Sequence, residues 1–171
     1  LLSATFEECK LLKRINLSNI TVVGKRCFKG CIKLENIDMP VLTKVGDEAF
    51  SYCISLKNMG FVSRLVQIGS KAFERCSMNY VSLEKCEKLG AQAFLNCTAL
   101  TRIALSSNIT SMGVAPFMGC TAVSLLNITG DCYTGYIHDL FADNYDDFNQ
   151  QITELKCIKK DSLKNSEFAG Y

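Results

Sequence analysis

The chain has 171 residues, enough for one globular domain with a sizeable core. Its hydrophobic content of 48% excludes intrinsic disorder, because that much apolar surface can offset the conformational entropy lost on folding. The net charge is +2 and the charged residues are scattered, which argues against nucleic acid or an anionic membrane as the partner. No apolar run approaches the roughly 18 residues that span a bilayer, so we expect no membrane span.

One motif recurs from the N-terminus onward. Its clearest copy, Ile68–Cys76, has an aliphatic residue and glycine, then a small residue, a phenylalanine and, three positions later, a cysteine. The phenylalanines recur every 21 to 23 residues: Phe6, Phe28, Phe50, Phe73, Phe94 and Phe117. The matching cysteines are Cys9, Cys31, Cys53, Cys76, Cys97 and Cys120. A period of about 20–29 residues with this aliphatic spacing is typical of leucine-rich repeats.

An L-x-x-I-x-L-like run follows each cysteine, as in 100–105. Its last two apolar residues are two positions apart, which is the side-chain period of a strand, so we predict one short parallel strand per coil there. The Phe-x-x-Cys segment has helical spacing and predicts a single tight turn on the opposite wall. The glycine four residues before each phenylalanine except Phe6 predicts a positive φ. These glycines are Gly24, Gly46, Gly69, Gly90 and Gly113.

Beyond Ile128 the repeat loosens. Four apolar residues spaced four, four and three positions apart predict a helix over about 137–149: Ile137, Phe141, Tyr145 and Phe148. Ile152, Leu155 and Cys157 predict a seventh strand over 152–157. The polar end, from Lys159, is expected to cover the last apolar face.

These elements predict a solenoid of about seven coils. Residues 1–130 form six regular repeats, and 131–171 form an irregular seventh in the same domain. Because a repeat is already under way at Phe6, we expect the chain to begin inside a larger array. One coil cannot bury its apolar face alone, whereas coils stacked about 4.8 Å apart share a continuous core with a ladder of phenylalanine rings.

Ten cysteines could indicate disulfides, but their positions favour buried, unbridged thiols. Six follow the phenylalanines, Cys27, Cys86 and Cys157 take other apolar positions of the repeat, and only Cys132 has no such position. Stacked side chains point in parallel, which suits the roughly 90° torsion of a disulfide poorly. With no C-x2-C pair and a single histidine, we expect no metal and no cofactor.

The recurring G-x-x-A-F-x-x-C-x-x-L-x-x-I-x-L resembles the BspA-like, or Treponema pallidum type, leucine-rich repeats over about residues 3–130. The resemblance implies a surface or secreted protein of the kind known from anaerobic bacteria and protozoan parasites. It also implies a role in adhesion and no catalytic residues. Only Pro40 matches the proline that often follows the strand in this family, and the resemblance does not extend to 131–171.

A search for catalytic or metal chemistry finds two candidates, both in the irregular region. His138 lies beside Asp139, but no spacing singles out the other members of a triad, so a solvated histidine is the favoured interpretation. A local acidic cluster could hold calcium through oxygen ligands. Its spacing is not that of an EF-hand loop, and aspartate near a helix start is favoured by the helix dipole. The cluster is Asp139, Asp143, Asp146 and Asp147.

Outward positions of the predicted strands define the candidate binding wall. The second outward column is the most suggestive, because it contains arginine and tyrosine, which often anchor interfaces. It reads Arg14, Asn36, Asn58, Tyr80, Arg102 and Leu125. We predict Arg14, Tyr80 and Arg102 as contact residues, and the alternative is a merely solvated sheet face.

The sequence therefore predicts a monomeric, non-enzymatic, protein-binding module of a larger cell-surface or secreted protein. Its expected partner is an extracellular matrix or host-cell protein, and its expected role is adhesion. The alternative is a structural spacer with no binding activity of its own. An enzyme would need a cleft with converging polar groups, for which 131–151 is the only candidate segment.

Overall fold

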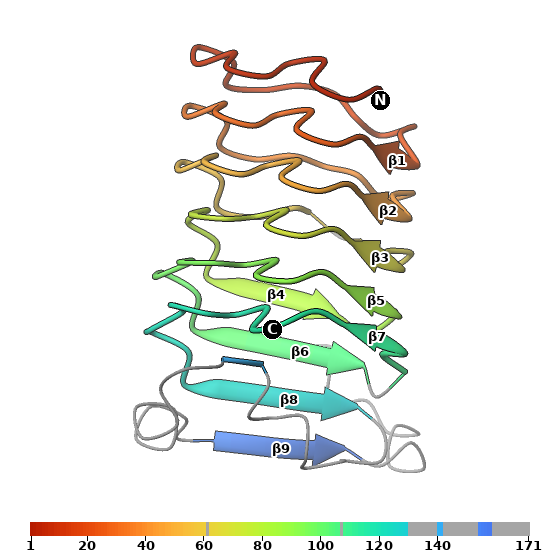
Figure 1. The fold of residues 1–171 in the computed structure, drawn as a ribbon, viewed down its shortest axis with the longest axis vertical. Coiled ribbons are helices and arrows are strands. Elements are labelled where there is room, and N and C mark those ends of the chain that lie inside the picture. The colour runs from red at the N-terminus through yellow and green to blue at the C-terminus, as the bar shows by residue number, and fades with distance from the viewer. Residues whose placement is uncertain (61, 107, 130–139, 142–153, 159–171) are drawn as a thin grey trace.

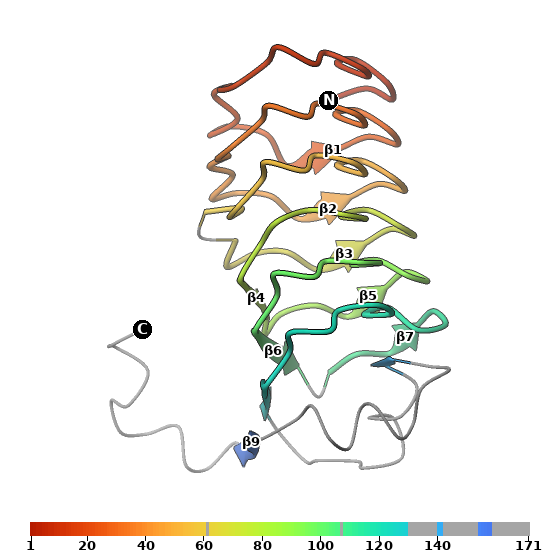
Figure 2. The ribbon, with the colours of Figure 1, turned by 90° about the vertical axis from the view of Figure 1, so that its left-hand side faces the viewer.

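The chain winds into a stack of coils (Figure 1), and the computed structural model describes residues 1–60, 62–106, 108–129, 140–141 and 154–158. One side of the stack carries a parallel sheet of two-residue strands, which we call the short-strand wall. In order, it comprises β1 (Val22–Val23), β2 (Lys44–Val45), β3 (Gln67–Ile68), β5 (Lys88–Leu89) and β7 (Ser111–Met112). A second parallel sheet comprises β4 (Tyr80–Leu83), β6 (Arg102–Ser106), β8 (Leu125–Thr129) and β9 (Glu154–Ile158). Figure 2 shows the two sheets along different sides of the stack.

The predicted strand in the L-x-x-I-x-L run forms only from the fourth coil onward. In the second and third coils the same position has a single parallel bridge, between Asn36 and Asn58. Pro40 has no N–H to donate to a ladder, and Gly60 has a φ of 66°, which turns the backbone away from the extended region. We call the outward side of all these runs the strand wall. The short strands at the aliphatic–glycine pairs were not predicted, because two residues are too few to show a period.

A tight turn is present at each Phe-x-x-Cys segment. The cysteine N–H donates to the phenylalanine C=O three residues earlier, at 3.1–3.2 Å in all six copies. The turn is not helical, because the residue two positions after each phenylalanine has a positive φ, as at Tyr52 (62°) and Arg75 (58°). We call this side of the stack, from two residues before each phenylalanine to the cysteine, the turn wall.

The prediction of positive φ at the repeated glycines is wrong. Among the described glycines, positive φ occurs at Gly30, Gly60 and Gly119, none of which occupies that position of the repeat. The repeated glycines are needed for space instead. A Cβ on Gly46 would lie 2.7 Å from the backbone nitrogen of Lys25 in the preceding coil, and one on Gly90 would lie 2.4 Å from the backbone of Gly69.

The number of coils is slightly lower than the predicted seven. The short-strand wall marks about five turns, because the first coil adds no strand to it. Most of the predicted helix over 137–149 lies outside the described residues. The exceptions are Leu140, whose C=O accepts a hydrogen bond from the N–H of Phe117 at 2.8 Å, and Phe141. The strand predicted over 152–157 overlaps β9 (Glu154–Ile158), which pairs in parallel with β8.

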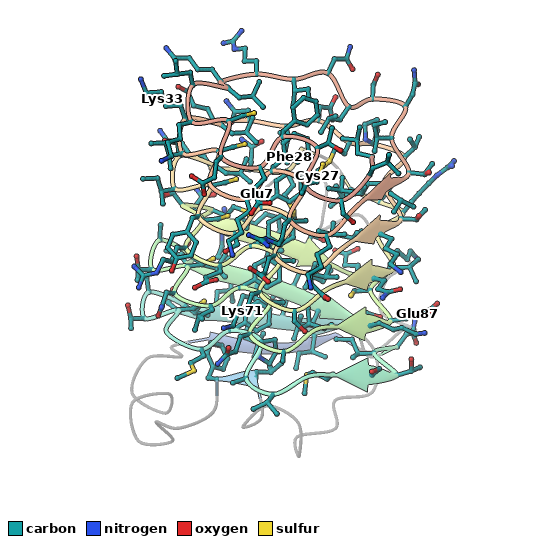
Figure 3. The ribbon with its side chains drawn as sticks, turned by 45° about the horizontal axis from the view of Figure 1, so that its top comes forward. Glu7, Cys27, Phe28, Lys33, Lys71 and Glu87 are labelled. Carbon is teal, nitrogen blue, oxygen red and sulfur yellow. The ribbon has the colours of Figure 1, made fainter. Side chains whose placement is uncertain are left out.

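The core is a single apolar cluster that runs through all the coils. Neighbouring rings from Phe6 to Phe117 stack with centroids 5.1–5.3 Å apart and planes within 9° of parallel. Phe141 continues the row with a tilt of 34°. Figure 3 shows Phe28 and Cys27 inside the stack, whereas Lys33 and Glu87 lie at its outer edges.

Candidate protein-binding surface

The second outward column forms a continuous row along the strand wall. Asn36 pairs with Asn58, and the side-chain amide of Asn58 donates to the Oδ1 of Asn36 at 3.0 Å. Tyr80 on β4 pairs with Arg102 on β6, which in turn pairs with Leu125 on β8. The parallel register thus places side chains from successive repeats about one strand spacing apart, although they are some 22 residues apart in sequence.

Tyr80 and Arg102 are in direct contact. The guanidinium carbon of Arg102 lies 5.4 Å from the centroid of the Tyr80 ring, which is a cation–π arrangement. Tyr80 is 42% exposed and Arg102 is half-buried. Of the three predicted contact residues, the structure brings these two together, whereas Arg14 lies exposed in the first coil.

A third outward column of the predicted strands lies two positions after the second and reads Asn16, Asp38, Gly60, Ser82, Ala104 and Asn127. It was expected to be outward along its whole length, but Ala104 is buried, with its single methyl group in register between Ser82 and Asn127. The Oδ1 atom of Asn127 is also buried, and it has no hydrogen-bond partner among the residues that the structure describes. The exposed part of the strand wall therefore includes the second column from Arg14 to Tyr80, together with the third column of the first three coils.

The turn wall carries a second set of contacts between coils that sequence reasoning missed. Arg26 forms an ion pair with Glu7, and Lys29 forms one with Glu48. The hydrogen bond from Lys29 holds the pKa of the Glu48 carboxyl below its usual range. Each ion pair joins one coil to the next, so these four charged side chains contact each other across the coils of the stack.

A tyrosine–arginine pair is also present on the turn wall. The guanidinium carbon of Arg75 lies 5.5 Å from the centroid of the Tyr52 ring. Both residues lie two positions after their phenylalanines, Phe50 and Phe73, so the repeat register alone could have placed them side by side. Ile54, which follows Cys53, is 50% exposed at the corner between the turn wall and the strand wall.

The thiols form an internal row. From the second coil to the sixth, the thiol three positions after the phenylalanine donates to the phenylalanine C=O of the preceding coil, at 3.0–3.3 Å. These five are Cys31, Cys53, Cys76, Cys97 and Cys120. Burial raises the pKa of Cys31 to about 11, so the thiol stays protonated and is a poor nucleophile.

Eight cysteines in the described part of the chain are free thiols, in agreement with the prediction for those residues. Cys9 departs from the expected burial, because it lies exposed in the first coil of the described stack. Cys132 lies outside the described residues.

Neither candidate for chemistry in the irregular region can be placed, since His138 and the aspartates near it lie outside the described residues. In the described ranges, no group of three histidine, cysteine or acidic residues could hold a metal ion. The same part of the chain contains no helix with the length and hydropathy needed to cross a bilayer.

Comparison with known proteins identifies the family. The model of the BspA type leucine-rich repeat region matches the chain in six copies, over residues 1–44 and 21–144. The chain therefore belongs to the BspA-type leucine-rich repeat family, whose repeats are generally non-catalytic and typically bind proteins. No curated protein sequence matches the chain significantly.

Two solved structures align with most of this chain. A leucine-rich cell surface protein from Faecalibacterium prausnitzii aligns over 88% of this chain and 71% of its own, with a TM-score of 0.55 and 14% identity. A leucine-rich repeat protein from Bacteroides ovatus aligns over 91% of this chain and 57% of its own, with a TM-score of 0.47 and 18% identity. The first of these similarities supports the parallel solenoid predicted from the sequence.

Proposed function

We propose that this chain is a non-enzymatic, protein-binding module of a larger cell-surface or secreted protein, and that its role is adhesion to a matrix or host-cell protein. Family membership supports the binding class, and the cell-surface description of the Faecalibacterium protein is consistent with the location. The partner contacts the strand wall through the second column, with Tyr80 and Arg102 at the centre and Arg14 at one end.

The observation that carries this proposal is the contrast between the inside and the outside of the stack. Inside, the same phenylalanine and cysteine recur in coil after coil. Outside, the second column changes from arginine to asparagine, tyrosine and leucine while its backbone register stays the same. Such a frame lets surface residues vary without cost to the core, which is the arrangement that extended repeat proteins use for binding.

The test is capture of matrix and host-surface proteins on the immobilised chain, compared with a Tyr80→Ala/Arg102→Ala double variant. We expect wild type to retain a partner with micromolar or better affinity, and the variant to weaken binding by about tenfold or more with an unchanged melting temperature. A chain that captures nothing is a spacer. Equal capture by both forms would place the binding surface elsewhere.

A further inference from the structure

The exposed apolar side chains of the third coil lie in the middle of the stack. Tyr52 is 41% exposed and Ile54 is 50% exposed, with stacked coils on both sides. Their exposure therefore does not result from the end of the stack, as it does for Leu2 and Leu11 in the first coil. Tyr52 also has a φ of 62°, a backbone conformation that residues with a Cβ rarely adopt.

Arg75 lies over the ring of Tyr52, and none of the acidic residues that the structure describes pairs with it. The acidic neighbour in the sequence, Glu74, accepts a hydrogen bond from the hydroxyl of the fully buried Ser51 at 2.9 Å. Within the described residues, Arg75 forms no ion pair. The cation–π contact with the ring restricts the position of the guanidinium group, and Arg75 is exposed, so its N–H groups can reach a partner.

The same arrangement recurs one coil further along, where Arg102 lies over Tyr80. Arg75 and Tyr80 belong to the same coil and are five residues apart, so the two pairs lead from the turn wall around the corner onto the strand wall. We call this set the corner band: Tyr52, Ile54, Arg75, Tyr80 and Arg102. Arg102 likewise forms no ion pair in the described part of the chain.

We propose that the corner band extends the binding surface onto the turn wall and takes a protein segment that carries carboxylate side chains. This inference rests on the proposed function, since it names the chemistry of the partner and adds Tyr52, Ile54 and Arg75 to its contacts. Arg75 and Arg102, which form no ion pair with any described residue, offer planar forks that fit carboxylates in a bidentate manner. Tyr52 and Ile54 supply apolar contact area beside them.

The probe is a blocked, fluorescent peptide of alternating glutamate and glycine, titrated with the whole chain at low ionic strength. Arg75→Lys keeps the charge but removes the fork, and Tyr52→Asn removes the ring with a residue that tolerates positive φ. Each should weaken binding by about tenfold. Arg64→Lys is the matched control, because Arg64 is exposed, lies outside the band and forms no cation–π contact with an aromatic ring of the described residues.

No binding of the glutamate peptide, or an equal loss with Arg64→Lys, would overturn the inference. Equal binding of the lysine counterpart peptide would do the same. Capture of the partner by the variants distinguishes failure of this inference from failure of the proposed function. If Arg75→Lys captures the partner as well as wild type does, while Tyr80→Ala/Arg102→Ala loses it, the corner band is wrong and the strand-wall proposal stands.

Discussion

At the scale of single residues, the turn wall depends on an unusual backbone conformation that recurs in every repeat. In each of the six turns, the residue two positions before the phenylalanine and the residue two positions after it have positive φ. The strain is offset by hydrogen bonds between coils. For example, the N–H of Lys71 donates to the C=O of Ala91 at 3.0 Å, and that of Arg75 donates to Leu95 at 2.8 Å. At these turn positions, Gly30 and Gly119 are the glycines, and the other residues with positive φ all have a Cβ.

Lys71→Gly should therefore stabilise the protein. The left-handed conformation costs an ordinary residue about 1–2 kcal/mol, and glycine loses about 0.5–1 kcal/mol in chain entropy. The expected net gain in the free energy of unfolding is roughly 0.5–1 kcal/mol, measured by urea denaturation. Lys57→Gly is the control, since Lys57 is also exposed but does not have a positive φ, and it should lower stability. A loss of similar size for both variants would contradict the strain argument.

At the scale of elements, the buried thiols inside and beside the thiol row make the stability of the protein fall at alkaline pH. Burial raises the pKa of Cys31 and of Cys86 from 9.0 to about 11. The unfolded chain therefore releases these protons before the folded chain does. The stabilisation is complete below pH 9 and is lost as the pH rises through 11.

We expect the melting temperature under reducing conditions to fall between pH 9 and pH 11. Cys86→Val removes one titrating thiol, so the slope of melting temperature against pH should become shallower over this interval. An identical slope in Cys86→Val and wild type would show that other groups cause the alkaline loss.

The short-strand wall depends on glycines that let adjacent coils approach. A Cβ on Gly90 would lie 2.4 Å from both the backbone carbon of Gly69 and the nitrogen of Ser70. Because backbone atoms cannot yield as a flexible side chain can, Gly90→Ala should destabilise the protein by about 1–3 kcal/mol. Thr98→Ala, at an exposed position, serves as control and should have little effect on the denaturation midpoint. An unchanged midpoint for Gly90→Ala would refute the spacing role.

Side-chain identity explains which features could be predicted from the sequence. The rings of Phe28 to Phe94 and their thiols could be placed because the same residue type recurs at each position. The positive φ at Tyr52 and Arg75 could not, because the equivalent positions also hold glutamate, asparagine and glycine. The glycine positions were recognised, but recurrence alone does not distinguish a conformational need from a steric one. For the binding surface, the strand period placed Tyr80 and Arg102 together, while a turn has no comparable period to reveal Tyr52.

At the scale of the whole molecule, each coil contacts only its neighbours, so stability is close to a sum of coil and interface terms. Phe73 stacks on two rings, 5.3 and 5.2 Å away, and is fully buried. Phe6 stacks only on Phe28 within the described residues and is half-buried. The same substitution should therefore have different effects at the two positions.

Phe73→Ala should lower the free energy of unfolding by about 3–5 kcal/mol, because it removes a buried ring and leaves a cavity that stacked coils cannot close. It should also lower the apparent m-value, since the break separates the coils on its two sides into weakly coupled units. Phe6→Ala should cost less than half as much and leave the m-value unchanged, because it loosens only the first coil. Urea denaturation followed by circular dichroism measures both quantities. Equal costs at the two positions would mean that the coils unfold as one indivisible unit, and the nearest-neighbour description of this stack would then fail.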